Sequence, residues 1–184
     1  RAWDEIAYIS PYYLPVYSAG NDGTNNNNPD PIAAGYDKLV GNKVAKNVLT
    51  IANAQDATIA TDGSLTSVSI DISSSQGPSD DRRIKPDISG NGSSVNSLYS
   101  SSDTATGQMS GTSMAAPNVA GVAALIRSYY PKLSAKQVKH ILMDSGVAIS
   151  TTVIVGGKAN DTRPFTSLSK SGKIVNAYNA LLMA

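Results

Sequence analysis

Apolar residues at helical spacing dominate the segment from Ser113 to about Tyr130, which predicts a long helix. Its side chains leave almost no polar face, so we expect this helix to lie inside the protein. Two further helices are predicted, at about 134–145 and about 173–183. Ser134 can cap the first of these with Gln137 three residues later, and apolar positions repeat at helical spacing in the second.

Shorter apolar runs earlier in the chain predict strands. LPVYSAGNDG (14–23) indicates a short buried strand that runs into a Gly-Asn turn. It follows DEIAYI (4–9), which has the pattern of the end of an amphipathic helix. NVLTIANAQDA (47–57) indicates a second apolar strand. A helix that leads into a buried strand is half of an α/β unit.

Two hairpins and two long loops are predicted between the strands and the helices. ATIATDGSLTSVSID (57–71) has two extended arms about Asp62-Gly63, a pair that favours a tight turn. Residues 94–111 indicate a second hairpin. The Asn-rich segment 23–42 and the segment 73–92 are expected to be loops, and the mixed charges of PSDDRRIKPD (78–87) are typical of a solvated loop.

The composition indicates one soluble globular domain, with 184 residues of which 41% are hydrophobic and 16% charged. A net charge of +1 with mixed signs favours neither a nucleic acid nor a membrane surface as a partner. The chain contains no cysteine, which excludes disulfides and cysteine nucleophiles. No apolar run reaches the length of a membrane span, and residues 1–15 lack the pattern of a signal peptide. No linker divides the chain into two domains.

Ser113 stands at the start of the predicted long helix. A hydroxyl there faces free backbone N–H groups and the positive end of the helix dipole. This setting suits an oxyanion that forms when the hydroxyl attacks a carbonyl. Pro117 lacks the N–H that would return to the carbonyl of Ser113, so the start of the helix is shaped around this residue. From the serine and the helix alone, an N-cap serine that opens a core helix is the alternative interpretation.

The motif around Ser113 is more specific than its position. SGTSMAAP (110–117) resembles the nucleophile segment of the subtilisin-like serine proteases, or subtilases, where Gly-Thr-Ser-Met-Ala and Pro stand at the head of a buried helix. YSAGNDG (17–23) resembles the oxyanion-hole segment of that family. SSQGPSDDRRIKPDISGNG (74–92) resembles its Ser-x-x-Gly-Pro loop and Lys-Pro-Asp. The resemblance implies an α/β fold with a subtilisin-like parallel sheet flanked by helices, represented by its second half only.

The same resemblance implies a serine endopeptidase that hydrolyses peptide bonds through an acyl-enzyme on Ser113. The backbone N–H of Ser113 and the side-chain amide of Asn21 would donate to the oxyanion. The Gly20 backbone would pair with extended polypeptide substrate. The substrate-binding residues implied by the family are Ser18, Ala19, Gly20 and Thr112. A secreted or cell-surface location is inferred from the family as well.

The chain departs from the family at the other two residues of the catalytic triad. Subtilases carry Asp, then His, then Ser, and both partners precede the oxyanion Asn. The one histidine, His140, follows Ser113 and is expected on the polar side of its helix, near Lys136 and Lys139. We therefore expect residues 1–184 to be the C-terminal portion of one peptidase catalytic domain. Alone it should hydrolyse no peptide, and it should pair with the missing N-terminal half or with a second copy.

Two alternatives stay open at this point. Sedolisin-like acid peptidases also carry Gly-Thr-Ser and use Glu and Asp in place of His, but they have Asp rather than Asn in the oxyanion role. A non-catalytic binding or scaffold module would keep a protease-like half-fold, and its expected mark is the loss of Ser113 or Asn21, both of which are present. No cofactor is predicted, and no EF-hand-like spacing indicates a metal site.

Overall fold

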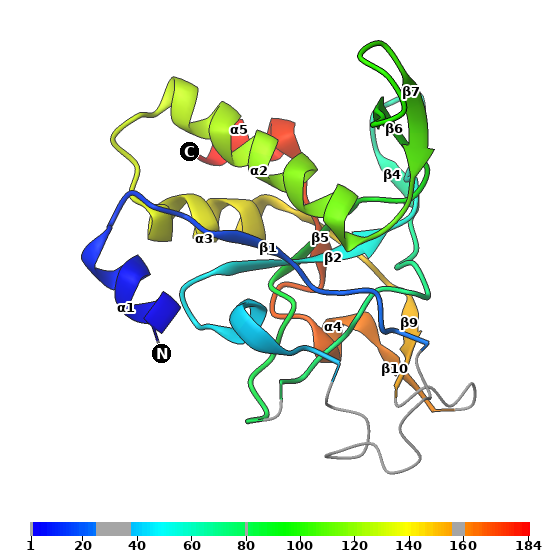
Figure 1. Cartoon of the computed structure of the whole chain (residues 1–184), viewed down its shortest axis with the longest axis horizontal. Coiled ribbons are helices and arrows are strands. Elements are labelled where there is room, and N and C mark those ends of the chain that lie inside the picture. The colour runs from blue at the N-terminus through cyan, green and yellow to red at the C-terminus, as the bar shows by residue number, and fades with distance from the viewer. Residues whose placement is uncertain (1, 25–37, 80, 156–160) are drawn as a thin grey trace.

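The computed structural model of the chain describes residues 2–24, 38–79, 81–155 and 161–184, so most of the predicted loop at 23–42 lies outside the described residues. A mainly parallel sheet of five strands forms the centre of the fold (Figure 1). Its strands are, in spatial order, β1 (Val16–Ser18), β2 (Leu49–Ala54), β5 (Ile88–Asn91), β11 (Lys173–Ile174) and β8 (Val147–Ala148). Neighbouring strands are parallel except β11 and β8. Because β1, β2 and β5 are parallel, their carboxyl ends meet at one edge of the sheet.

Helices cover one face of this sheet. The long helix α2 (Thr112–Tyr129) packs across β1, β2 and β5, and α3 (Ala135–Ser145) and α5 (Ala177–Met183) pack beside it (Figure 1). Alternate residues of β2 point toward the helices or away from them, because side chains alternate along a strand. The core on the helical side contains Leu49, Ile51, Ile88, Ala115, Ala116, Val119, Ala123, Ile126, Val138, Leu142, Met143 and Ala180.

A second hydrophobic core involves shorter elements. The helix α4 (Phe165–Leu168) follows the antiparallel pair β9 (Thr152–Ile154) and β10 (Thr162–Pro164). This core contains Ala52, Ala54, Ile70, Ile149, Val153, Val155, Phe165, Leu168 and Ile174. β2 contributes to both cores, which explains why all six of its residues are buried.

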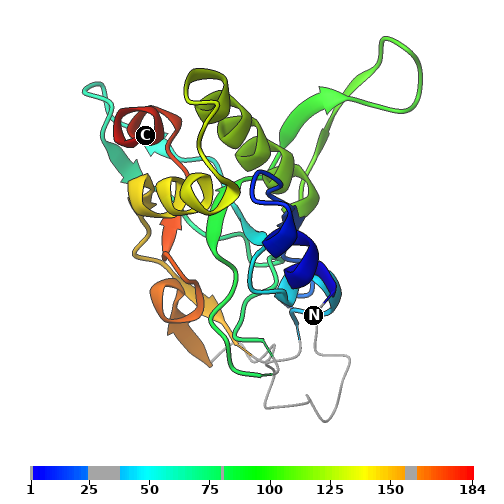
Figure 2. The same ribbon diagram turned by 90° about the vertical axis from the view of Figure 1, so that its left-hand side faces the viewer.

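The remaining elements lie at the periphery. α1 (Ala2–Ile9) precedes β1, and the short 3₁₀ helix η2 (Gly41–Val44) precedes β2. β3 (Thr58–Ile59) pairs with β4 (Leu65–Ser67), and β6 (Val95–Leu98) pairs with β7 (Thr106–Met109). Both predicted hairpins are thus confirmed, and the second projects away from the body of the molecule (Figure 2).

Two strands occupy segments for which the sequence predicted other structure. The predicted loop 73–92 contains β5, a central strand with the composition Ile-Ser-Gly-Asn. Ser, Gly and Asn have a low propensity for strands, but pairing with β2 and β11 makes this segment a strand nevertheless. The predicted helix at 173–183 begins only at Ala177, because Lys173–Ile174 form β11 and the Asn176 side chain caps the helix by accepting from the Asn179 N–H at 2.9 Å.

Burial also differs from the prediction at two elements. β1 is half-buried rather than buried, because it lies at the edge of the sheet with β2 on one side only. α2 is buried along one face, and Leu125 on its other side is 39% exposed. The described parts of the chain cover only one side of this helix. The capped helix predicted at 134–145 is confirmed as α3, with a capping box between Ser134 and Gln137.

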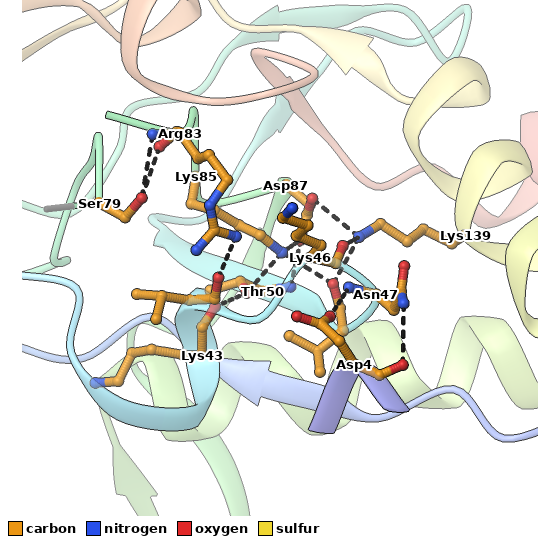
Figure 3. A network of polar contacts seen from close by, with 12 residues as sticks. Asp4, Lys43, Lys46, Asn47, Thr50, Ser79, Arg83, Lys85, Asp87 and Lys139 are labelled. Atoms are coloured by element: carbon orange, nitrogen blue, oxygen red, sulfur yellow. Dashed lines mark hydrogen bonds and ion pairs between the residues drawn. The ribbon is translucent and has the colours of Figure 1, made fainter. Parts of the chain in front are cut away.

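The loop predicted to be solvated at 78–87 is exposed at Asp81 and Arg82, but its last residues belong to a buried ionic network. Lys85 and Asp87 are both buried, and the Lys85 Nζ lies 2.5 Å from an Asp87 carboxylate oxygen (Figure 3). Lys139, predicted on the polar side of its helix, is also buried and lies 3.1 Å from the other Asp87 oxygen. The Lys85 and Lys139 ammonium groups each donate to the carbonyl of Val48. The network therefore ties α3 to the amino ends of β2 and β5.

Candidate active site

Ser113 lies in the first turn of α2, with an exposed side chain. Gly111 precedes the helix with a φ of 147°, a conformation that side chains disfavour. A Cβ at position 111 would lie 3.1 Å from the Asn21 Nδ2. Glycine at this position thus allows Asn21 to lie directly against the start of the helix.

The backbone N–H groups at the start of α2 are nearly all engaged. The Gly111 N–H donates to the carbonyl of Gly92 at 2.8 Å. The Thr112 N–H donates to the Asn21 Oδ1 at 3.0 Å, and the Met114 N–H to the Gly111 carbonyl at 3.0 Å. Within the described part of the chain, the Ser113 N–H has no acceptor. It is the N-terminal amide that the helix leaves available to a negatively charged oxygen.

Asn21 is held in one orientation by Thr112. Its Oδ1 accepts from both the N–H and the hydroxyl of Thr112, at 3.0 Å each. Two donors on the same oxygen fix which end of the amide faces the helix. The Asn21 side chain is exposed, and its Nδ2 amide group is left to donate elsewhere. This is the arrangement that an oxyanion donor requires.

The turn that carries Asn21 is held by a residue that the sequence did not indicate. Ser75 donates its N–H to the carbonyl of Gly20 at 2.8 Å, and its hydroxyl accepts from the Asp22 N–H at 3.0 Å. These two bonds bracket Asn21 on both sides. Ser75 belongs to the Ser-rich stretch before Gly77-Pro78, so the available signal was the resemblance of that loop to the subtilase pattern.

The four predicted substrate-binding residues lie together, but their exposure differs. Ser18 and Gly20 are half-buried, whereas Ala19 and Thr112 are fully buried. The Gly20 N–H donates to the Thr112 hydroxyl at 3.1 Å, and this hydroxyl donates in turn to the Asn21 Oδ1. Thr112 thus joins Gly20 to Asn21, and the pairing of the Gly20 backbone with substrate stays a prediction.

A second turn, at Gly92 and Ser93, contacts Gly111. The carbonyl of Gly92 accepts from the Gly111 N–H at 2.8 Å, and Ser93 next to it donates its hydroxyl to Asp71 at 3.0 Å. Burial of Asp71 would by itself raise its pKa, but hydrogen bonds from Ser73 and Ser93 hold the pKa below its ordinary value. Asp71 therefore stays charged and keeps the turn in place.

His140 does not belong to this cluster. It is exposed on α3, as the sequence predicted, and lines a surface cavity with Lys136 and Lys170 rather than with Ser113 or Asn21. The described residues thus bring together the Ser113 hydroxyl, the Ser113 N–H and the Asn21 amide, without a histidine beside the hydroxyl. Such a set can stabilise a tetrahedral intermediate, and it needs a general base to generate one.

Comparison with known proteins identifies the family. A sequence model of the Subtilase family matches residues 5–172. The subtilisin-like protease PopC of Myxococcus xanthus is 33% identical over 142 residues, which cover 74% of this chain and 24% of PopC. The minor extracellular protease Vpr of Bacillus subtilis is 40% identical over 81 residues, covering 41% of this chain and 10% of Vpr. The chain thus spans about a quarter or less of the length of these relatives.

Solved structures share the fold. The patellamide maturation protease PatA superimposes with a TM-score of 0.65 and 18% identity, over 97% of this chain and 53% of PatA. The prenylagaramide maturation protease PagA gives a TM-score of 0.64 and 20% identity, over 97% of this chain and 52% of PagA. At such identities the likeness supports the fold alone. In the described ranges, no helix combines the length and apolar character needed to cross a membrane.

Proposed function

Because the chain belongs to the subtilase family, we propose that it carries the nucleophile and the oxyanion hole of a serine endopeptidase. The Ser113 hydroxyl attacks the carbonyl carbon of a peptide bond and passes its proton to a general base. The Ser113 N–H and the Asn21 amide donate to the resulting oxyanion. The intermediate then collapses to an acyl-enzyme on Ser113 as the leaving amine takes up the proton, and water hydrolyses the ester.

One observation supports this assignment more than any other. The Asn21 amide is oriented by two hydrogen bonds from Thr112, at 3.0 Å each, although Asn21 is exposed. Because the Asn21 oxygen is engaged by Thr112, the Nδ2 group is the end of the amide that can donate to substrate. The held amide and the unpaired Ser113 N–H together form a preorganised pair of donors, which is the largest contribution to catalysis in many acyl-transfer enzymes.

We further propose that the general base comes from outside these 184 residues. The only histidine in the sequence is His140, which lies away from Ser113 in a different surface region. The chain would then be the C-terminal portion of the catalytic domain, and alone it would hydrolyse no peptide. The free edge of β1 is where the N-terminal portion, or failing that a second copy, would add strands. We call the chain together with the segment that supplies the base the complete enzyme.

The substrate is a polypeptide, as for other members of the family. Ser18 and Gly20 are half-buried beside Asn21, so they offer one wall to the residue before the cleaved bond. Vpr is named an extracellular protease, and a relative from Thermus is named an extracellular serine proteinase. We propose the same secreted or cell-surface location for this protein.

The proposal is tested by comparing Ser113→Ala with Ser110→Ala in the complete enzyme. Both residues are exposed serines next to the start of α2. Peptide hydrolysis is expected to fall by about 10⁴-fold or more in Ser113→Ala, since the nucleophile is lost, and to stay within about twofold in Ser110→Ala. Retained hydrolysis in Ser113→Ala would remove Ser113 from the mechanism. An equal loss in both variants would mean that the segment matters for folding only.

A further inference from the structure

A cavity of about 390 Å³ lies where α1, the start of α3 and the segment before β2 meet. Lys46 and Asn47 precede the amino end of β2, whereas Asn21 follows the carboxyl end of the parallel strand β1. The cavity is therefore at the opposite end of the sheet from Ser113. Figure 1 shows this separation, with α1 on one side of the molecule and the start of α2 on the other.

The cavity is lined by lysines from three separate parts of the chain, namely Lys46, Lys136, Lys139 and Lys170, and by His140. None of the described residues that line it carries a carboxylate. Lysine ammonium groups attract oxyanions as point charges, and clustered like charges in a hollow focus their field on its interior. Lys46, Lys136 and Lys170 are exposed, so their ammonium groups are accessible to an anion that enters the cavity.

Two neighbouring carboxylates are engaged by other groups, and a third, Asp144, lines an adjoining cavity with His140 and Lys170 rather than this one. Asp87 pairs with two buried lysines, Lys85 and Lys139, so that the ionic network itself keeps a surplus positive charge (Figure 3). Lys139 also lines the cavity. Asp4 of α1 binds the Asn47 N–H at 2.8 Å and points to the backbone rather than to a lysine. Repulsion from Lys170 is among the causes that lower the pKa of Lys139, after burial.

The cavity also has an apolar wall. Tyr8, Pro11 and Tyr13 line it together with the basic residues. A volume near the lower limit of small-molecule sites suits a compact ligand rather than a polymer. Tyrosine rings beside lysine ammonium groups suit a ligand that has an organic group attached to an anionic group.

We propose that this cavity binds a small multivalent oxyanion, a phosphate or sulfate group that is either free or esterified to a compact organic group. Lys46, Lys136 and Lys170, which come from three separate parts of the chain, hold the oxyanion. Binding would stabilise the junction of α1, α3 and β2, because the ligand binds the folded state only. The site lies away from Ser113, so it can be tested on the complete enzyme by binding alone, with no readout of peptidase activity.

The experiment measures binding of inorganic phosphate, pyrophosphate and phenyl phosphate by calorimetry, and their effect on the thermal midpoint at constant ionic strength. Pyrophosphate is expected to bind saturably and to raise the midpoint, whereas sodium chloride does neither. Tighter binding of phenyl phosphate than of phosphate would identify an esterified ligand, and equal binding a free oxyanion.

Variants separate this site from general attraction to a basic surface. Lys136→Gln combined with Lys170→Gln should weaken pyrophosphate binding by about tenfold or more. Lys132→Gln, a change of an exposed lysine outside the cavity, should leave it unchanged. Both are surface substitutions, and a circular dichroism spectrum checks that they fold. Unchanged affinity in the double variant, an equal loss in Lys132→Gln, or a response to chloride would overturn the proposal.

Discussion

The Asn21 Oδ1 lies 3.0 Å from both the backbone nitrogen and the hydroxyl oxygen of Thr112, a residue 91 positions later in the chain. This contact joins the turn after β1 to the first residue of α2. It also sets the orientation of the Asn21 amide relative to the next residue, Ser113. The two proposed oxyanion donors are therefore positioned through one buried threonine.

Replacing Thr112 with valine is expected to loosen this contact. The variant keeps the backbone bond but loses the hydroxyl that joins Gly20 to Asn21, so the amide is less well oriented. We expect kcat of the complete enzyme to fall about tenfold, with a loss of about 1–3 kcal/mol in the free energy of unfolding. Thr112→Ser keeps the hydroxyl and serves as the control. Valine and serine variants with equal kcat would contradict the positioning role.

Replacing Asn21 with leucine removes the amide donor itself. We expect kcat to fall by about 10²–10³, which is the magnitude established for the loss of such a donor in subtilisin. KM should change less, because the oxyanion forms only after attack. Steady-state kinetics of the complete enzyme measures both. A change confined to KM would assign Asn21 to substrate binding instead.

Gly92 can be tested for its support of the helix start. A Cβ at this position would lie 2.5 Å from the Gly111 carbonyl oxygen and 2.7 Å from the Ala115 nitrogen. Gly92→Ala should therefore displace α2 and lower the free energy of unfolding by about 1–3 kcal/mol. Gly121→Ala is the matched control, since its Cβ would meet no atom within 4 Å and should stabilise the helix by about 0.5–1 kcal/mol. Urea denaturation of the chain distinguishes the two, and equal stabilities would contradict the predicted clash.

The buried ionic network predicts how stability depends on pH. Burial lowers the pKa of Lys85 from 10.5 to about 8, although the Asp87 carboxylate opposes this shift. Between these values the unfolded chain still binds the proton that the folded chain has lost, so the free energy of unfolding rises with pH. Lys85→Met should remove this part of the rise, whereas Lys132→Met at an exposed site should keep it. Denaturation midpoints of both variants, measured from pH 8 to 10.5, test this difference. An equal rise with pH in both variants would exclude Lys85 as the source of the rise.

The sequence predicted α3, the hairpins and the start of α2 because neighbouring residues determine these elements. The capping pair Ser134 and Gln137, the Asp62-Gly63 turn and the helical spacing after Ser113 act within a few residues. β5 was missed because Ile-Ser-Gly-Asn becomes a strand only through its neighbours in the sheet. The exposed side of α2 could not be foreseen, since burial depends on what the rest of the chain covers.

The residues of the candidate site likewise fall into those that a motif indicates and those that depend on long-range contacts. Ser113 and Asn21 stand in motifs that resemble a known family, so the sequence indicated them directly. The roles of Thr112 and Ser75 depend on hydrogen bonds between segments more than 50 residues apart, which no local pattern records. The same holds for the Lys85, Asp87 and Lys139 network, where a run that is charged in sequence becomes buried by packing against α3.

The central claim, that Ser113 is the nucleophile of a subtilase, is tested most directly by covalent labelling. The complete enzyme is treated with a fluorophosphonate, which reacts with activated serines, and the modified peptide is located by tandem mass spectrometry. We predict a single adduct on Ser113, its absence in Ser113→Ala, and no labelling of the 184-residue chain alone, since we propose that the base comes from outside it. An adduct on another serine, or labelling that persists in Ser113→Ala, would contradict it.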